Sequence, residues 1–156
     1  VIDIMYELLR AGYVDESGCF DETHFEMGFA LCKDMVFTQE DIREIQLAKA
    51  AVCAGIETLT AEFGTDFDHI DRLYLAGGFG QKINLESACG IGLIPTELQR
   101  KTVAVGNTSL AGAVKVGINP EKLSELEKIV SMSEEVILAD SMEFGERYIE
   151  RMNFGE

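Results

Sequence analysis

Apolar side chains recur at the three- and four-residue spacing of a helix along the segment that follows Thr38. Thr38 is a favourable N-cap, Asp41 stands where a capping box has Glu or Gln, and Gly64 provides a stop. The pattern therefore predicts a long amphipathic helix from Thr38 to about Phe63 that packs on a core. The residues expected on its core-facing side are Ile42, Ile45, Val52, Cys53, Ile56, Leu59, Thr60 and Phe63.

Shorter elements are expected on both sides of this helix. Residues 1–12 follow helical spacing up to Gly12, and the alternation over 24–31 predicts a strand that pairs with a return strand over Met35–Phe37. Turn residues and spacing predict the remaining elements, which are helices over 84–90, 108–116, 120–130 and 142–152 and a candidate last strand over 136–138.

Two segments share the order of apolar buried strand, small-residue turn and helix. Residues 73–80 end in a Gly-Gly-Phe-Gly loop, and residues 103–112 turn at Gly106-Asn107. Strands that alternate with helices predict an α/β fold, in which ligands bind beyond the carboxyl ends of strands. Glycines there let backbone N–H groups approach a phosphate or a flat base. The glycine run lacks the G-x-G-x-x-G spacing and a P-loop lysine, so an ordinary tight turn is the alternative.

Gln46 and Lys49 lie three positions apart on one face of the long helix, and Lys49 interrupts a stripe that is otherwise apolar. Two polar side chains at this spacing can hold one ligand together, through its hydroxyl or phosphate groups. The alternative is that the stem of Lys49 lies along the apolar stripe and carries the ammonium group to water.

The length and charge of the chain narrow the possible partners. It has 156 residues, enough for one domain or two small lobes, and its 13 basic and 28 acidic residues give a net charge of -15. This charge argues against non-specific binding to nucleic acid or anionic membranes. No apolar stretch approaches the roughly 20 residues of a membrane span, so we expect a soluble domain over residues 1–156. The first residues carry neither a signal peptide nor an initiating Met, which indicates part of a longer chain.

The cysteines do not form a recognisable site. They are scattered without a CxxC pair, at Cys19, Cys32, Cys53 and Cys89. This spacing argues against a metal site and against disulfides, and we expect reduced thiols in a cytoplasmic protein. Asp66, Asp68 and Asp71 surround His69 in the sequence, and we expect this group to cap and solvate a turn rather than to bind a metal.

Three segments, in their order along the chain, resemble the reductive activators of corrinoid proteins. They are residues 42–49 (IREIQLAK), 73–80 (LYLAGGFG) and 106–113 (GNTSLAGA), and the resemblance also includes 91–95 (IGLIP) and 144–154. Those activators are ATP-dependent iron–sulfur proteins whose carboxyl-terminal part belongs to the superfamily of actin, sugar kinases, acetate kinase and DnaK-type chaperones. The resemblance implies an α/β, ribonuclease H-like ATPase lobe over residues 1–156, without the amino-terminal lobe and the iron–sulfur domain.

The resemblance also implies a site for ATP or ADP, with Mg²⁺ accompanying the nucleotide. Residues 73–80 would be the adenosine motif of the superfamily, with Gly77 and Gly78 against the base and ribose. Phe79 and Gln81 would border the adenine, although DnaK-type chaperones carry an Arg at the position of Gln81. The implied cofactor-binding residues are Gln46, Lys49, Cys53, Gly77, Gly78, Phe79, Gly80, Gln81, Gly106 and Asn107.

The long helix would supply the other side of this site. Gln46 and Lys49 would face the ribose hydroxyls, with Cys53 one turn further along the pocket wall. Gln46 stands where the superfamily has an acid. No catalytic residue is expected in this chain, because the phosphate-binding hairpins and catalytic acids of the superfamily lie upstream of the matching segments.

For the intact relatives, the resemblance implies reduction of cob(II)alamin to cob(I)alamin on the corrinoid protein of a methyltransferase system, driven by ATP. The electron would come from a 2Fe–2S cluster in a separate domain, so this chain alone is expected to be inactive as an enzyme. One alternative is a module that docks a partner through its acidic carboxyl-terminal segment and lacks nucleotide chemistry. Another is a small-molecule kinase lobe of the same superfamily. Without a second lobe, self-association of the chain is also expected.

Overall fold

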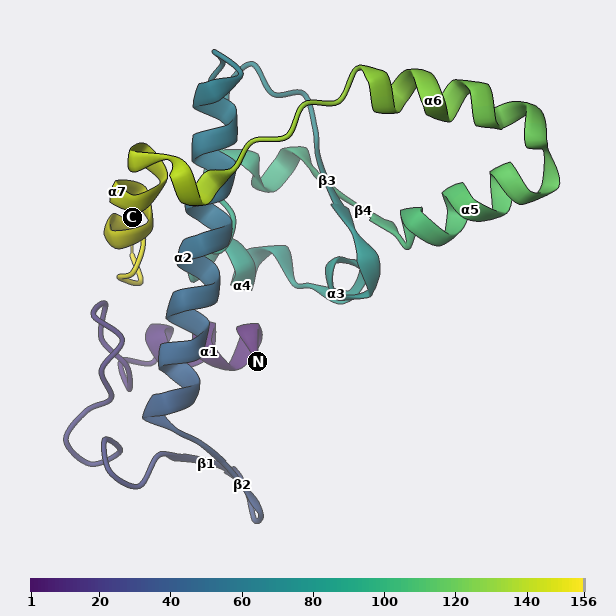
Figure 1. Ribbon diagram of the computed structural model, residues 1–156. Coiled ribbons are helices and arrows are strands. Elements are labelled where there is room, and N and C mark those ends of the chain that lie inside the picture. Colours follow the sequence, from purple (N-terminus) through teal and green to yellow (C-terminus); the bar gives the residue numbers. More distant parts are fainter. Residues whose placement is uncertain (156) are drawn as a thin grey trace.

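The computed structural model describes residues 1–155, in which helices outnumber strands (Figure 1). The α-helices are α1 (Ile2–Arg10), α2 (Gln39–Glu62), α3 (Gly77–Lys82), α4 (Leu85–Gly90), α5 (Thr108–Ile118), α6 (Leu123–Ser131) and α7 (Met142–Glu150). The strands are β1 (Phe29–Cys32), β2 (Met35–Phe37), β3 (Leu73–Ala76) and β4 (Thr102–Gly106). Short 3-10 helices are η1 (Thr96–Lys101), η2 (Pro120–Lys122) and η3 (Leu138–Asp140). The predicted α/β class is confirmed.

Helix α2 is the axis around which the other elements are arranged (Figure 1). It has 24 residues and begins with a complete capping box, in which the hydroxyl of Thr38 accepts from the amide of Asp41 and the carboxylate of Asp41 accepts from the amide of Thr38. Asp therefore serves in place of Glu or Gln. The chain leaves the helix at Gly64, whose φ of +72° suits glycine. Both predicted ends of the long helix are confirmed.

Two small sheets complete the frame. Strands β1 and β2 form an antiparallel hairpin that projects from the body, as Figure 1 shows, and β1 begins at Phe29 rather than at residue 24. The segment 22–27 forms turns instead, held by hydrogen bonds such as that from the amide of Phe25 to the carbonyl of Asp21. Strands β3 and β4 are parallel, with Leu73 opposite Thr102 and Leu75 opposite Ala104.

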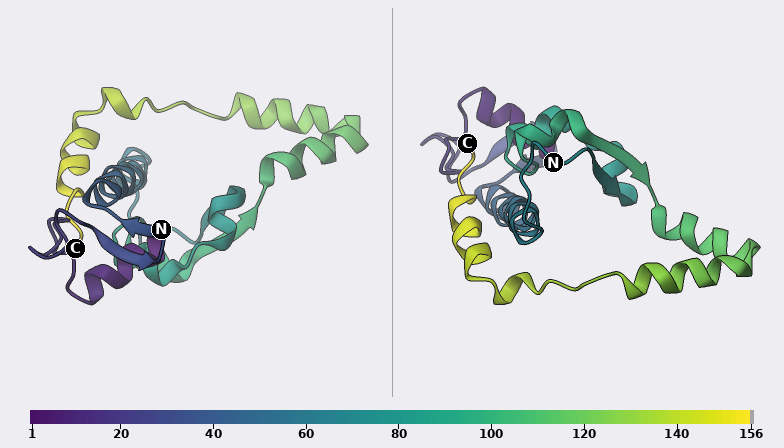
Figure 2. Two further views of the ribbon diagram at one scale, coloured as in Figure 1. Left: turned by 90° about the horizontal axis from the view of Figure 1, so that it is seen from below. Right: turned by 90° about the horizontal axis from the view of Figure 1, so that it is seen from above.

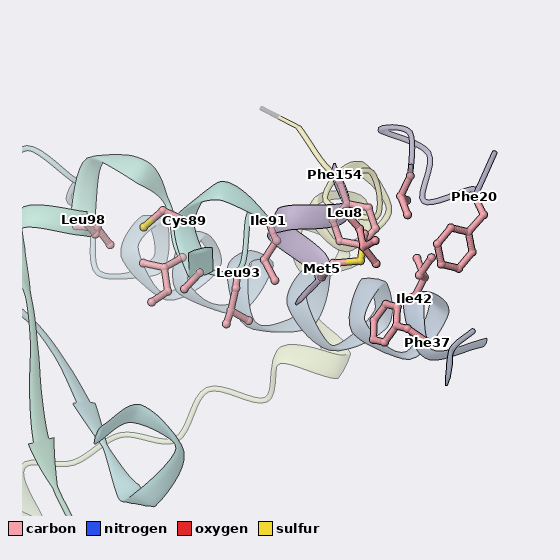
Figure 3. Packing of buried hydrophobic residues seen from close by; sticks show 13 residues of the cluster. Met5, Leu8, Phe20, Phe37, Ile42, Cys89, Ile91, Leu93, Leu98 and Phe154 are labelled. Atoms are coloured by element: carbon pink, nitrogen blue, oxygen red, sulfur yellow. The ribbon is translucent and has the colours of Figure 1, made fainter. Parts of the chain in front are cut away.

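The apolar core lies between α1, α2, α4 and the two ends of the chain (Figure 3). Its fully buried members include Met5, Ile42, Ile91, Leu98 and Phe154. Phe154 therefore closes the core from the carboxyl terminus, next to residues of the first helix.

The buried face of α2 matches the predicted stripe only in part. Val52, Leu59 and Phe63 are 46%, 47% and 85% exposed, so their predicted place in the core is wrong. Ile42 and Cys53 of the predicted stripe are buried, and Ile45 and Ile56 are partly buried against the core, so this part of the prediction is confirmed. The other buried positions of α2 carry small or polar residues, namely Gln46, Lys49, Ala50, Ala54, Gly55 and Thr58. Small side chains let α7 pack closely along this face, and the two helices make extensive contact.

Helices α5 and α6 form an arm that extends away from the body in every view (Figures 1 and 2). Neither helix contains a buried residue, and Leu110, Ile118, Ile129 and Met132 are between 60% and 83% exposed. Self-association through this apolar surface stays a prediction. Among the helices of residues 1–155, none combines the length and apolar character that crossing a bilayer requires.

Three further expectations need correction. Residues 136–138 do not form a strand, because the chain there crosses α2 and Leu138 enters a 3-10 helix instead. Residues 77–80 form the start of α3 rather than a glycine loop. Strand β3 was expected to be buried, but only one of its faces is covered. Leu73 and Leu75 on that face are half-buried, whereas Tyr74 on the other face is 59% exposed.

Replacement of Thr38 by Ala is expected to destabilise the fold, because the amide of Asp41 loses its acceptor at the start of α2. The free energy of unfolding should fall by about 1 kcal/mol, as for other N-cap threonines. Urea denaturation followed by circular dichroism measures the change. Thr23→Ala, at an exposed turn position, is the matched control and should leave the midpoint unchanged. Equal midpoints for Thr38→Ala and the control would contradict a stabilising role for the cap.

Candidate functional site

The predicted site residues of the two strand–helix units meet at the carboxyl ends of β3 and β4. These ends are adjacent because the strands are parallel, and β3 leads directly into α3 as β4 leads into α5 (Figure 1). Helix α3 also contacts β4. A methyl group placed on Gly106 would lie 3.9 Å from the Nε2 atom of Gln81. The structure therefore brings residues 77–81 and Gly106 together.

The glycines of this strand-end group have different surroundings. A methyl group on Gly77 or Gly78 would meet no protein atom within 4 Å, and the φ of Gly77 is +92°, which disfavours any other residue. Phe79 beside them is 71% exposed. At Gly80, by contrast, a methyl group would lie 2.9 Å from the Cβ of Leu75, so glycine is needed there for packing on β3. Gly77 and Gly78 thus present open backbone, which a flat group can approach.

Asn107 starts the helix on the neighbouring strand. Its side-chain oxygen accepts a hydrogen bond of 3.0 Å from the amide of Leu110 and caps α5. Gly106 before it has a φ of +69°. These two residues make the sharp turn from β4 into α5, which is a structural role.

Gln46 is buried on α2, where its Nε2 atom donates to two backbone carbonyls and its Oε1 atom accepts from the guanidinium of Arg43 at 3.4 Å. It is 2% exposed, and its Nε2 atom donates to the carbonyl of Ser17 at 2.9 Å and to the carbonyl of Met152 at 3.1 Å. Gly18 makes this approach possible, because a methyl group there would overlap the carboxamide of Gln46. Gln46 thereby ties an early loop and the carboxyl terminus to the same helix.

Lys49 is buried one turn later and also contacts the carboxyl-terminal segment. It is 1% exposed, its Nζ atom donates to the carbonyl of Asn153, and the ammonium lies 5.0 Å from the ring centroid of Phe154. The alternative of a lysine that reaches water is therefore wrong. Burial lowers the pKa of Lys49 from its usual 10.5 to about 8, because removal from water disfavours the charged form.

A cavity of about 480 Å³ borders Lys49. Its walls come from α2, from the segment 89–97 and from the carboxyl terminus, and its polar lining includes Lys49, Cys53, Glu57, Cys89, Glu97 and Arg151. The guanidinium of Arg151 forms an ion pair of 2.6 Å with Glu57, while its Nε atom is buried and makes no hydrogen bond within the described residues. Lys49 and Cys53, two of the residues predicted to bind nucleotide, line this cavity, whereas Gln46 does not.

The two thiols of the cavity are held in the neutral form. Burial, followed by the charge of Glu57, raises the pKa of Cys53 from 9.0 to about 11, and burial also raises the pKa of Cys89. Neutral buried thiols are poor nucleophiles and poor metal ligands. Within residues 1–155, no group of three or more His, Cys, Asp or Glu side chains is placed to hold a metal ion.

The two groups of candidate residues are not brought to one place. The cavity at Lys49 and Cys53 has no lining residue from 77–81 or 106–107. Helix α2 lies between the carboxyl-terminal segment on one side and the β3–β4 pair on the other (Figures 1 and 2). The predictions from sequence missed Arg151, Glu57 and the backbone of 152–153. The positions of Gln46 and Lys49 in an apolar stripe indicate that these side chains have buried hydrogen-bond partners. The sequence does not indicate which residues those partners are.

Comparison with known proteins identifies the family. A family model described as the C-terminal domain of RACo, the ASKHA domain, matches residues 1–156. The chain belongs to this family. The resemblance that the three motifs indicated is therefore confirmed, together with the ASKHA fold.

Individual relatives agree with this assignment. A solved structure named as a reductive activator for corrinoid, iron–sulfur protein is 32% identical, with a TM-score of 0.87 over 98% of this chain. A corrinoid activation enzyme, RamQ, from Eubacterium limosum is 31% identical over 80% of the chain. A Co(II) methylated amine-specific corrinoid protein reductase from Methanosarcina barkeri is 27% identical over 75% of the chain. The matches span 27%, 21% and 22% of those proteins.

Lys49→Met is expected to change how the stability of the ASKHA domain depends on pH. Between the folded pKa of about 8 and the usual value of 10.5, the unfolded chain binds more protons at Lys49 than the folded chain does. The cost of a buried charge is fully present below pH 8 and is relieved as the pH rises. From pH 8 to 9 the free energy of unfolding of the wild type should rise relative to Lys49→Met, by at most about 1 kcal/mol.

Urea denaturation of both proteins at the two pH values measures this difference. Cys53 has the opposite tendency, because its raised pKa costs stability as the pH rises through 9.0 towards about 11, but it is present in both proteins. Lys82→Met, at an exposed position of α3, should leave the pH dependence as in the wild type. A constant difference between wild type and Lys49→Met would show that Lys49 titrates as an exposed lysine.

Proposed function

We propose that this chain is the adenosine-binding part of an ATP-dependent reductive activator that acts on a corrinoid protein. The names of the relatives support the class of partner, since each refers to a corrinoid or a corrinoid protein. The chain covers about a quarter or less of those relatives, so the whole activity would require parts that they contain beyond this match. We also propose that the corrinoid protein belongs to a methyltransferase system.

The observation that carries the nucleotide site is the open backbone at Gly77 and Gly78, placed at the carboxyl end of β3. Parallel strands bind ligands at this end, and the adjacent turn at Gly106 borders the same edge. The exposed ring of Phe79 adds an aromatic surface beside the glycines. A flat base with its ribose fits backbone that no side chain covers, and the phosphates of ATP or ADP, with Mg²⁺, would extend away from it.

The reaction proposed for the whole activator is a one-electron reduction of Co(II) to Co(I) in the corrinoid of the partner. The electron would come from an iron–sulfur cluster, for which the described residues have no site. The role of this chain would be to bind nucleotide and to change conformation when it does so. No phosphoryl acceptor is part of this proposal.

A second candidate is a docking module without nucleotide chemistry. The observation that favours it is the state of Gln46 and Lys49, which donate to the carbonyls of Met152 and Asn153 rather than to an open site. In that case the carboxyl-terminal helix, with Glu143, Glu146 and Glu150, would serve contact with a partner. Nucleotide binding distinguishes the two candidates.

Gly78→Val is expected to abolish or strongly weaken binding of ATP and ADP. The new side chain would enter open space next to the glycine backbone, so it should block the base while leaving the protein packing unchanged. Isothermal titration calorimetry with each nucleotide measures the affinity, with a loss of roughly tenfold or more expected, equivalent to about 1.4 kcal/mol. Saturable binding by the wild type that Gly78→Val weakens would support the adenosine site.

Gly117→Val is the matched control, because it also lies in a helix with open space around it but at the far end of α5. It should bind nucleotide as the wild type does. Equal affinity of Gly78→Val and the wild type would exclude the strand-end site, and a wild type that does not bind nucleotide would favour the docking module. Lys49 is a poor probe for this purpose, since its removal also disturbs the buried contacts of the carboxyl terminus.

A further inference from the structure

The ammonium of Lys49 is buried without an acidic partner. Lys49 is 1% exposed, and its ammonium donates to the carbonyl of Asn153 and lies 5.0 Å from the ring centroid of Phe154. None of the ion pairs formed within residues 1–155 includes Lys49. A carbonyl oxygen and a ring face carry only partial negative charge, so the positive charge of Lys49 is not neutralised by these partners.

A second cation with an unused donor borders the same cavity. One terminal nitrogen of Arg151 is paired with Glu57 at 2.6 Å, while the buried Nε atom of Arg151 makes no hydrogen bond within the described residues. Burial is the largest cause that lowers the pKa of Lys49, and the positive charge of Arg151 lowers it further. Buried donors in native proteins nearly always have an acceptor, so the unpaired Nε atom indicates a partner that the chain itself does not supply.

The cavity leaves room for such a partner. It has a volume of about 480 Å³, and Gly92 in its wall has a φ of +74°. A methyl group on Gly92 would lie 3.3 Å from the Nζ atom of Lys49, so the glycine leaves this side of the ammonium uncovered. Of the two acids in the lining, Glu57 is engaged with Arg151 and Glu97 is exposed to solvent. The unbalanced charge at the wall of this cavity is therefore positive.

We propose that the cavity binds a small oxyanion, a phosphate or carboxylate group held between the ammonium of Lys49 and the guanidinium of Arg151. Such a group would supply the negative charge that Lys49 lacks and the acceptor that the Nε atom of Arg151 lacks, through charge-assisted hydrogen bonds. No residue of 77–81 or 106–107 lines the cavity, so this site is separate from the proposed nucleotide site and does not depend on it.

Oxyanion binding should be coupled to proton uptake at Lys49. A negative charge beside the ammonium favours its protonated form and returns its pKa from about 8 towards 10.5. The thiols at the cavity remain protonated near pH 8, since their pKa values are raised already and an anion raises them further. The titratable and charged groups that border the cavity, from every element around it, are Lys49, Cys53, Glu57, Cys89, Glu97 and Arg151.

Calorimetric titration of the chain with sulfate tests the proposal, because sulfate is an oxyanion that does not itself titrate near neutral pH. The titration is performed at pH 8 and constant ionic strength, in two buffers that differ in their enthalpy of ionisation. The wild type should bind sulfate in a saturable manner and take up about half a proton per ion, since Lys49 with a pKa of about 8 is half protonated when the cavity is empty. Absence of saturable binding, or binding without proton uptake, would overturn the proposal.

Lys49→Met and Arg151→Gln should each weaken sulfate binding by roughly tenfold or more, because each removes one of the two charged donors. Circular dichroism establishes that both variants are folded, and the proton uptake of the wild type tests the site without any variant. Arg10→Gln is the matched control, since Arg10 also forms an ion pair with a glutamate but is exposed, and it should bind sulfate as the wild type does. Unchanged affinity in both cavity variants would place the bound ion elsewhere and contradict the proposed site.

Two further titrations identify the source of the oxyanion and separate this site from the proposed nucleotide site. Tighter binding of phenyl phosphate than of inorganic phosphate would identify an organic ligand, and equal affinity would identify the free ion. Gly78→Val should bind sulfate as the wild type does, because Gly78 does not line the cavity. A wild type that binds sulfate but not ATP would overturn the proposed function alone, and one that binds ATP but not sulfate would overturn the oxyanion site alone.

Discussion

A charged group inside a protein needs partners, and the ammonium of Lys49 imposes this constraint on the fold. Lys49 and Gln46 lie in the middle of α2, and their partners are carbonyls 104 and 106 positions later in the sequence. To bring those carbonyls into place, α7 must pack along α2 and Phe154 must enter the core. Ser17 and Met152, which lie far apart in the sequence, are thus joined through Gln46 of α2.

The strand-end region obeys a different constraint. There the parallel pairing of β3 and β4 sets two turns side by side, and glycine keeps the backbone of the first turn open. The arm of α5 and α6 extends from this region, and neither helix contains a buried residue. The domain therefore consists of a body packed around α2 and a strand edge at which the backbone of Gly77 and Gly78 is not covered by side chains.

The two regions are connected through α2, because the carboxyl-terminal segment and the β3–β4 pair lie on opposite sides of that helix (Figures 1 and 2). The relatives share this region over most of its length, and their names connect it with corrinoid proteins.

The local signals in the sequence determined where elements begin and end. Thr38 and Asp41 cap α2, Gly64 ends it, and the apolar runs before Gly77 and Gly106 become β3 and β4, because caps, turns and short strands depend on neighbouring residues. The three motifs also sufficed to identify the family. Only the tertiary structure decided which face of α2 is buried, since Val52 and Leu59 match a core pattern as well as Ala50 and Ala54 do. The partners of Gln46 and Lys49 likewise depend on contacts more than 100 positions apart, and no periodicity within one helix contains that information.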